Sequence, residues 1–314
     1  MKQLSRDAFN RARAFLTTQA RPLDRALFEH RFEAAPAERV LTELARYQND
    51  GGGFGHALEP DLRTPSSSAL ATGIGLTVLK ELKCSPEHTM VADAVQFLRE
   101  TFDEQGQMWR VVPHDANDYP HAPWWHDEDG SLARTFDGFL IIPRAQIVGL
   151  LHDYSALVPA DWLDATTEAT VTAIETLGGD AFGGGGDTLR YALDLVETEP
   201  LPQRFKDRLM PRLRELAAQV VCRDPQEWNG YCATPLKIAP APRSVVEDVL
   251  KGDLQRNLDY KIDHQSPTGA WEPTWTWGDF YREAWEQARI EWQGHLTLQT
   301  LTTLHAFGRI ERAQ

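Results

Sequence analysis

Two stretches of the sequence share the form Gln-x3-Gly-x-aromatic: Gln48-Asn49-Asp50-Gly51-Gly52-Gly53-Phe54 and Gln265-Ser266-Pro267-Thr268-Gly269-Ala270-Trp271. Each follows a stretch of helical periodicity, 40–47 or 254–262, and each precedes another, 67–82 or 294–307. The glutamine can bridge to backbone groups at the start of a neighbouring helix, the glycine allows a left-handed backbone, and the aromatic residue packs under the junction. The sequence therefore predicts a repeated unit of helix, turn and helix.

Weaker copies of this turn lie elsewhere in the chain, at Gln226-Glu227-Trp228-Asn229-Gly230-Tyr231 and Gln105-Gly106-Gln107-Met108-Trp109, and 178–186 is a further glycine-rich turn. Together these turns give about five hairpins spaced roughly 40–60 residues apart, which is typical of helical repeat folds. Strand-like alternation is nearly absent. We expect an all-α fold: a single α/α toroid domain over 1–314, built from about five to six helical hairpins, with long rim loops near 110–140 and 271–285.

Composition limits the class of protein. The 314 residues are 42% hydrophobic and 25% charged, as in ordinary globular proteins. The formal net charge of -14 disfavours a nucleic-acid partner. The charged start at 1–7 and the lack of a run of ~18 apolar residues predict a cytoplasmic protein without stable membrane insertion. Three cysteines fit a reducing compartment, and the oligomeric state stays open.

The two clear turns also carry a family resemblance. Tyr47 to Gly55 and Asp263 to Trp271 resemble the Gln-Trp motif of squalene and oxidosqualene cyclases and the glycine-rich turns of protein prenyltransferase β subunits. The stretch 54–65 is similar to bacterial proteins labelled prenyltransferase-like. This resemblance covers most of the chain and implies a toroid whose central cavity takes an isoprenoid or other apolar small molecule, with acid-base or carbocation chemistry. The Asp-x-Asp-Asp acid motif and the Asp-Asp-x2-Asp diphosphate motif are absent, so the cyclase acid is not carried over.

Four polar residues between the first turn and the next helix are the catalytic candidates: His56, Glu59, Asp61 and Arg63. Polar residues just before an inner helix of a toroid lie at the rim of its cavity. Two carboxylates, an imidazole and a guanidinium within eight positions could hold and tune a general acid. The alternative is a rim network in which Arg63 pairs with Asp61 or Glu59 and fixes the loop.

A second cluster lies in a proline-rich loop and supplies substrate-binding candidates: Trp124, Trp125, His126 and Asp127. Tryptophan faces can stabilise a carbocation, and the adjacent carboxylates could hold Mg²⁺ for a diphosphate. The alternative is a long surface lid with solvated acids. We expect no cofactor, with Mg²⁺ as the alternative.

An aromatic-rich segment near the other end supplies four further substrate-binding candidates: Trp271, Trp275, Trp277 and Trp292. These side chains suit the wall of an apolar cavity. The alternative is ordinary core packing, which is the default at spacings of three or four residues.

Other chemistries have weaker support. Cys222, Asp224, Cys232, His264 and His295 are residue types found in zinc sites but lack the tight spacing, so we predict no metal. The run 183–187 lacks the Lys-Ser/Thr of a P-loop, and no Gly-x-Ser-x-Gly elbow occurs. Two alternatives to the isoprenoid enzyme remain: a non-catalytic toroid that binds a ligand or protein, and a carbohydrate-active α/α-barrel enzyme.

Overall fold

The computed structural model describes residues 1–311, and these residues form two compact units. Unit 1 comprises Met1–Glu43, Gly184–Gly186 and the described part of Ala217–Gln314. Unit 2 comprises Leu44–Gly183 and Asp187–Leu216. The expectation of one domain over 1–314 stays a prediction, and its last residues, 312–314, lie outside the described part.

The regular secondary structure of the described residues is helical, and strand pairing within 1–311 is limited to isolated bridges. The α-helices are α1 (Arg6–Thr18), α2 (Pro22–Glu33), α3 (Ala37–Leu44), α4 (Ala69–Glu81), α5 (Thr89–Glu100), α6 (Ser131–Thr135), α7 (Arg144–Asp153), α8 (Ala160–Thr176), α9 (Asp187–Glu197), α10 (Gln203–Val220), α11 (Pro235–Ile238), α12 (Glu247–Asp263) and α13 (Arg282–Ala306). Short 3-10 helices span Ala45–Tyr47, Ala116–Asp118, Pro123–Trp125, Asp137–Phe139, Ser155–Leu157 and Gly179–Phe182.

The order of helices matches the predicted repeat. Apart from the short α6, successive helices form six helix-connection-helix pairs within 1–311: α1 and α2, α3 and α4, α5 and α7, α8 and α9, α10 and α11, α12 and α13. The structure therefore confirms the all-α prediction and its five to six hairpins.

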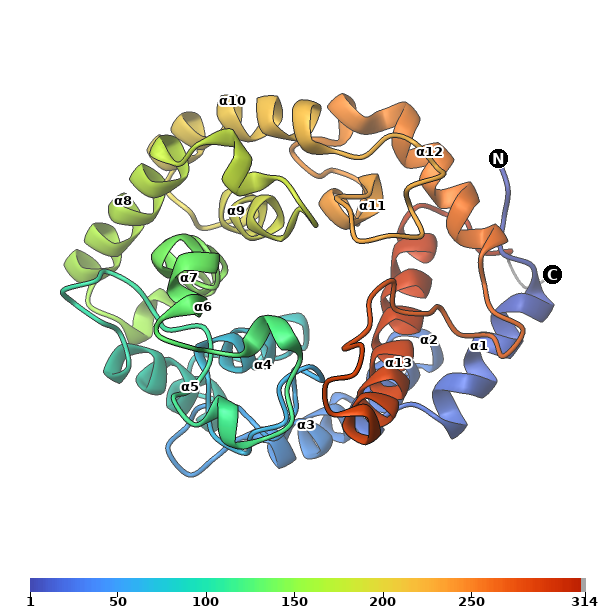
Figure 1. Ribbon diagram of the computed structural model, residues 1–314, viewed down its shortest axis with the longest axis horizontal. Coiled ribbons are helices and arrows are strands. Elements are labelled where there is room, and N and C mark those ends of the chain that lie inside the picture. The colour runs from blue at the N-terminus through green and yellow to red at the C-terminus, as the bar shows by residue number, and fades with distance from the viewer. Residues whose placement is uncertain (312–314) are drawn as a thin grey trace. The chain divides into compact units, whose positions relative to one another are not determined.

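Unit 2 has two layers of helices (Figure 1). The inner row is α4, α7 and α9, with α7 packed against both neighbours, and the outer row is α5, α8 and α10. Because the chain returns through an outer helix between successive inner ones, the inner helices run parallel. The long connections that precede them, 48–68, 102–143 and 177–183, therefore lie at the same end of the unit.

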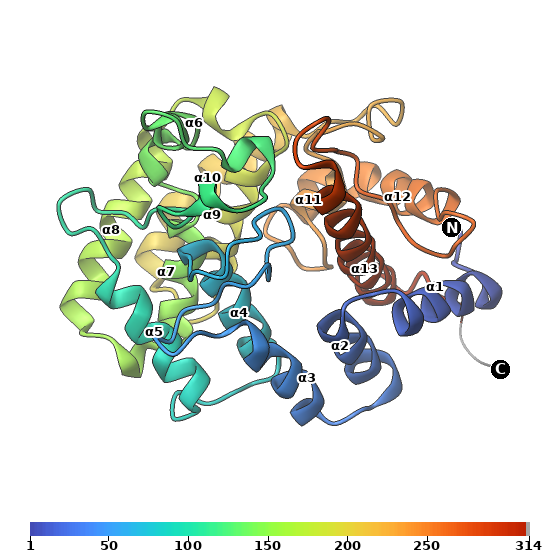
Figure 2. The same cartoon turned by 60° about the horizontal axis from the view of Figure 1, so that its bottom comes forward.

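Unit 1 brings the two ends of the described chain together. Its helix α13 packs against both α1 and α2 (Figure 2). The N–H of Leu4 donates to the carbonyl of Arg309 over 2.7 Å, and the N–H of Glu311 donates to the carbonyl of Leu4 over 3.1 Å. A Cβ on Gly294 would lie 2.8 Å from the Cβ of Ala20, so glycine is needed where α13 approaches the start of α2.

In the turns at Gln48 and Gln265, the glutamine side chain holds its turn against a neighbouring helix, as the sequence predicts. We call this arrangement the clamp. Gln48 Nε2 donates to the carbonyls of Gly52 at 2.8 Å and Met90 at 3.1 Å, and Met90 lies in the first turn of α5. Gln265 Nε2 donates to the carbonyls of Gly269 at 2.9 Å and Ala8 at 2.9 Å, and Ala8 lies in the first turn of α1. Each glutamine thus ties its turn to a neighbouring helix of the same unit.

The glycines and aromatics of the two turns match as well. Gly52 and Gly269 have φ of 84° and 93°, and a Cβ there would lie 2.3 Å and 2.4 Å from a helix carbonyl, that of Asp93 or Arg11 respectively. The N–H of the aromatic residue donates to a threonine hydroxyl over 3.0 Å in both copies, Phe54 to Thr72 and Trp271 to Thr297. The predicted roles of glycine and aromatic are confirmed.

In the two weaker copies of the turn, the feature that recurs is a buried tryptophan. Trp109 and Trp228 are buried, and their indole N–H groups donate to the carbonyls of Leu98 at 2.6 Å and Cys222 at 2.9 Å. Trp271 does the same with the carbonyl of Lys261 at 2.8 Å.

No helix within 1–311 is both long enough and apolar enough to cross a membrane.

Candidate functional site

The structure brings the first two predicted clusters together in unit 2. The segment that holds Glu59 and Asp61 runs beside the loop 119–126: the N–H of Ala122 donates to the carbonyl of Asp61 over 2.8 Å, and the N–H of Arg63 donates to that of Pro120 over 3.0 Å. Residues of the catalytic and substrate-binding sets that are about 60 positions apart thus lie side by side.

The hydroxyls of the first segment tie it further to the second loop. Ser66 Oγ donates to the Asp115 carboxylate over 2.6 Å, and Thr64 Oγ1 donates to it over 3.3 Å. Asp115 therefore anchors residues 56–66, which we call the polar segment, to the loop that carries Trp124 to Asp127.

His56 is the outermost of the four predicted catalytic residues. Its side chain is exposed, its φ of 55° is left-handed, and its Nε2 is 2.8 Å from Asn49 Oδ1. Asn49 in turn donates to the carbonyl of Pro65 and the hydroxyl of Ser67. The imidazole is thus held against the glutamine turn, within reach of solvent.

The three other predicted catalytic residues are less accessible. Glu59 is 7% exposed, Asp61 is 2% exposed, and Arg63 is half-buried. Arg63 Nη1 lies 3.4 Å from the carbonyl of Pro60, a contact that helps to hold the loop. Carboxyl groups withdrawn from water in this way differ from the solvated acids of an ordinary surface loop.

The histidines of the second cluster form a stacked pair. The ring centroids of His121 and His126 are 5.3 Å apart, and the angle between the ring planes is 8°. His121 Nε2 is 3.1 Å from His126 Nδ1. Burial lowers the pKa of His121, with a further lowering by His126, and its hydrogen bonds to backbone carbonyls only partly offset this. His121 is therefore neutral near pH 7.

The carboxylate of Asp127 pairs with groups of its own loop. Arg110 forms an ion pair with its carboxylate, and the N–H of Leu132 donates to it over 3.2 Å. Burial raises the pKa of Asp127, but the hydrogen bonds from Arg110 and Leu132 and the charge of Arg110 outweigh burial and lower that pKa overall. The carboxylate thus has a structural partner.

The two tryptophans of this cluster differ in burial. Trp124 is half-buried, whereas Trp125 is 7% exposed and stacks on Phe136 with ring centroids 5.3 Å apart. The indole N–H of Trp125 is buried and has no hydrogen-bond partner among residues 1–311. A buried unpaired donor is costly and calls for a partner.

The third predicted cluster lies in unit 1. Trp271 and Trp277 are buried, and Trp271 is the aromatic of the second clamp. Trp275 and Trp292 are half-buried and meet edge to face with centroids 5.0 Å apart. The indole N–H of Trp275, like that of Trp125, is buried without a partner in the described chain.

The aromatic segment continues into α13, which begins at Arg282. Trp292 meets His295 edge to face at 5.5 Å. Burial lowers the pKa of His295 to about 4; the charges of Arg21 and Arg31 act in the same direction, and Asp24 opposes them. This imidazole is neutral near pH 7 and extends the aromatic surface.

Sequence reasoning missed a polar stripe on α9. Arg190 Nη2 donates to both Asp194 at 2.8 Å and Glu197 at 2.6 Å, so one guanidinium is shared by two carboxylates. Gln146 Nε2 of α7 lies 3.4 Å from Asp194 Oδ2. The signal was present in the sequence, because Arg190, Asp194 and Glu197 recur at spacings of four and three on one helix.

The stripe has unusual electrostatics. Burial raises the pKa of Asp194, and Glu197 raises it further, so that the opposing effects of Arg190 are outweighed. Burial also raises the pKa of Tyr191, with added effects of Asp187, Asp194 and Glu59. The effect of Glu59 on Tyr191 links this predicted catalytic residue electrostatically to the α9 stripe.

A cavity of about 280 Å³ opens beside this stripe in unit 2. Its lining comes from all three inner helices and the residue after α9: Thr77, Lys80, Glu81, Gln146, Leu150, Asp194, Glu197 and Thr198. The Asp194 side chain is 33% exposed, so its carboxyl group is both accessible and held by fixed partners. An accessible carboxyl group with a raised pKa can deliver a proton.

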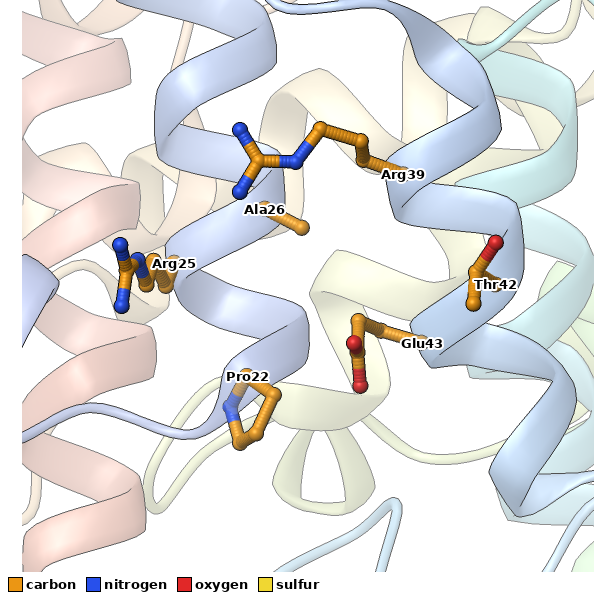
Figure 3. A pocket seen from close by; sticks show the side chains of 6 residues that line it. All are labelled: Pro22, Arg25, Ala26, Arg39, Thr42 and Glu43. Atoms are coloured by element: carbon orange, nitrogen blue, oxygen red, sulfur yellow. The ribbon is translucent and has the colours of Figure 1, made fainter.

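A second cavity, of about 390 Å³, lies between α2 and α3 in unit 1. Figure 3 shows Arg39 and Glu43 reaching from α3 towards α2. Both arginines at this cavity are paired with one acid, because Glu29 accepts a hydrogen bond from Arg25 over 2.9 Å and forms an ion pair with Arg39 over 2.7 Å. The cavity therefore offers no arginine that lacks an acidic partner.

Metal chemistry has no visible site in the described chain. Within residues 1–311, no group of three or more His, Cys, Asp or Glu is arranged to hold a metal ion. Of the zinc-type residues, Cys222 and Cys232 lie together, while His264 stacks on Tyr260 at 3.7 Å. The expectation of a protein without a cofactor stays a prediction.

Comparison with known proteins shows a likeness of fold. No family model matches the sequence, and no curated protein matches it. Among solved structures, the chain is similar to the type II terpene cyclase MstE from Scytonema in its apo form, with a TM-score of 0.51 and 11% identity, over 96% of this chain and 98% of that one. The described helices and this likeness together confirm the predicted fold class: the chain has an all-α, α/α-toroid fold of the terpenoid-cyclase kind.

Proposed function

We propose that the protein is an enzyme that acts on an isoprenoid or another apolar small molecule by acid-base or carbocation chemistry. The observation that carries the proposal is the fold shared with a type II terpene cyclase along 96% of the chain. Fold alone does not secure an activity, so the chemistry has to come from residues of this chain.

Asp194 is our candidate for the proton donor. Its pKa is raised, its carboxyl group lines a cavity, and Arg190 and Gln146 fix its position. Glu59 and Asp61 remain the candidates from the polar segment, since both are buried at the end of unit 2 where the long loops lie. A raised pKa and a fixed position both favour a role as general acid, and Asp194 has both features.

The tryptophan clusters supply what a cationic intermediate needs. Electron-rich ring faces stabilise positive charge without reacting with it. Trp125 in unit 2 and Trp275 in unit 1 each also present a buried N–H that would be satisfied by an acceptor oxygen of a ligand. A prenyl diphosphate offers both an apolar chain and such oxygens.

The test is a product screen with purified protein. Geranyl, farnesyl and geranylgeranyl diphosphates and squalene are incubated with the wild type, and products are identified by gas chromatography and mass spectrometry. We expect turnover that falls at least ~100-fold in Asp194→Asn, because general acid catalysis contributes that much or more. Glu59→Gln and Asp61→Asn test the polar segment in the same way.

The matched control is Glu175→Gln. Glu175 lies on α8 in the outer layer, where Arg208 holds its carboxylate over 2.7 Å. This variant removes a paired carboxylate without touching the cavity, so its turnover should equal that of the wild type. Absence of product and of binding across the whole substrate panel would refute the proposal.

One observation favours a second candidate, a carbohydrate-active enzyme. The cavity beside α9 has three carboxylates (Glu81, Asp194 and Glu197), two threonine hydroxyls and one glutamine amide in its lining, which suit a hydroxyl-rich ligand. Binding on a glycan array, together with loss of that binding in Asp194→Asn, would favour this candidate over the isoprenoid enzyme.

A further inference from the structure

Two of the three cysteines lie in the loop 221–234, which joins α10 to α11 in unit 1. The N–H of Cys222 donates to the carbonyl of Ala233 over 2.9 Å, so the two ends of this loop run side by side. Cys222 is therefore within side-chain reach of Cys232, although ten positions separate them in the sequence.

The two thiols share partners. They lie within hydrogen-bond distance of each other. The Cys222 thiol also donates to the Glu227 carboxylate, with Sγ 3.0 Å from Oε2, and the Cys232 thiol donates to the Glu227 carbonyl over 3.4 Å. Both cysteines are half-buried, so a small reagent can reach them while their separation stays fixed.

The loop is anchored around the pair. Trp228 is 2% exposed, and its indole N–H donates to the carbonyl of Cys222. The Trp228 ring meets Tyr260 of α12 edge to face at 5.2 Å. Such anchoring holds the thiols near each other rather than leaving their meeting to loop motion.

We propose that Cys222 and Cys232 are a reversible modification site that closes to a disulfide when the protein meets a peroxide. The sulfur of one thiol attacks a peroxide oxygen and the O–O bond breaks, so that a sulfenic acid forms and the leaving hydroxide takes the thiol proton and departs as water. The other thiol attacks that sulfur, the S–S bond forms, and a second water leaves with the sulfenic oxygen. Two electrons pass from the thiols to the peroxide, and a thiol reductant reverses the step.

The surroundings slow the oxidation of the pair, so its closure requires an excess of peroxide. Burial raises the pKa of Cys222, and its hydrogen bonds with Glu227 and Cys232 raise it further, to about 12. A thiol with this pKa is protonated near neutrality and reacts slowly by itself.

The chain contains its own control, because Cys84 is also half-buried but lies in unit 2, where no other cysteine is present. The full-length protein is treated with hydrogen peroxide under native conditions, and free thiols are then counted after denaturation. We expect the count to fall from three to one, with Cys84 as the remaining thiol in peptide mapping. After treatment, dithiothreitol should restore all three.

Cys222→Ser and Cys232→Ser separate an internal disulfide from general oxidation. Each variant should keep both of its remaining thiols under the same treatment, whereas the wild type should contain a peptide linked through Cys222 and Cys232. Retention of three thiols by the wild type would overturn the proposal. Oxidation of Cys84 at the same rate, or disulfide-linked dimers in place of the internal bond, would also overturn it.

Discussion

The turns at Gln48 and Gln265 share their hydrogen bonds and their glycine geometry, but they differ in the segment that follows the aromatic residue. In each, a glutamine donates to two carbonyls, a glycine with positive φ lies against a helix backbone, and the aromatic N–H donates to a threonine. The segment between aromatic and threonine differs. The two partners are 18 residues apart in the Gln48 turn of unit 2 and 26 apart in the Gln265 turn of unit 1.

The content of that segment differs even more than its length. In unit 2 it carries His56, Glu59, Asp61 and Arg63, whereas in unit 1 it carries Trp275, Trp277 and Trp292. The extra length in unit 1 is helical, because α13 begins 15 positions before its threonine and α4 begins three positions before its own. The comparison teaches that the clamp fixes where an inner helix starts, while the inserted segment is free to take up different chemistry.

The largest test of this comparison is the clamp glycine. Gly52→Ala and Gly269→Ala should each destabilise by about 3 kcal/mol or more, because a Cβ would strain the left-handed backbone and press on a helix carbonyl. Urea unfolding of both variants measures the effect. Gly51→Ala is the matched control, since a Cβ there meets nothing within 4 Å. A cost below about 1 kcal/mol in either copy would mean that the two clamps are not equivalent.

The next test concerns the aromatic segment and uses pH. His295 has a pKa of about 4 in the folded protein, whereas a histidine in the unfolded chain titrates near ~6.5. Between these values the unfolded chain binds more protons, so stability is fully present above pH ~6.5 and falls as pH drops towards 4. We expect a loss of about 2 kcal/mol, after discounting for the half-exposed ring.

His295→Gln should flatten this pH dependence, as measured by urea unfolding at several pH values. His56→Gln is the control in the polar segment of unit 2, where the imidazole is exposed. An unchanged slope in His295→Gln would show that His295 is not a group that titrates on unfolding.

The third test removes the clamp glutamine. Gln48→Ala and Gln265→Ala each delete a side chain that donates to two carbonyls, and we expect a cost of about 1.5 kcal/mol in each copy. Thermal or urea unfolding gives the values. Gln105→Ala, at an exposed position in a weaker copy, should change stability by less than about 0.5 kcal/mol. Equal costs at Gln48 and Gln105 would remove the distinction between clear and weak copies.

The smallest effect on stability should come from the polar segment. His56→Ala removes one exposed hydrogen bond to Asn49, so unfolding should change by less than about 0.5 kcal/mol. If the segment is catalytic, the same variant lowers turnover by at least ~10-fold while the melting temperature stays constant. A large loss of stability would instead show that His56 helps to hold the turn in place.

The fold was readable from the sequence because its decisive contacts follow a local pattern. Within each turn, glutamine and glycine are four positions apart, and that spacing recurs with the helical stretches around it. The helix carbonyls that complete the clamp are 42 positions from Gln48 and 257 from Gln265, so the sequence could suggest a neighbouring helix but not which one.

The candidate site was only partly readable. The position of the polar residues just before an inner helix could be predicted from the sequence, but the burial of Glu59 and Asp61 and the pairing of Asp127 with Arg110 across 17 residues could not. The α9 stripe was overlooked because charged residues at helical spacing ordinarily mark a solvated face. The start of α13 was missed because Tyr281 precedes it with a left-handed backbone and gives no side-chain cap.

The clamp between Gln265 and the first turn of α1 has a consequence for synthesis of the chain. Residues 1–43 belong with residues after 217 in unit 1, whereas unit 2 is nearly continuous in sequence. On the ribosome, unit 2 has all of its own helices once α10 has emerged to Val220, but α1 and α2 must wait for α13. We expect the N-terminal hairpin to be the part of the nascent protein most exposed to proteases and chaperones.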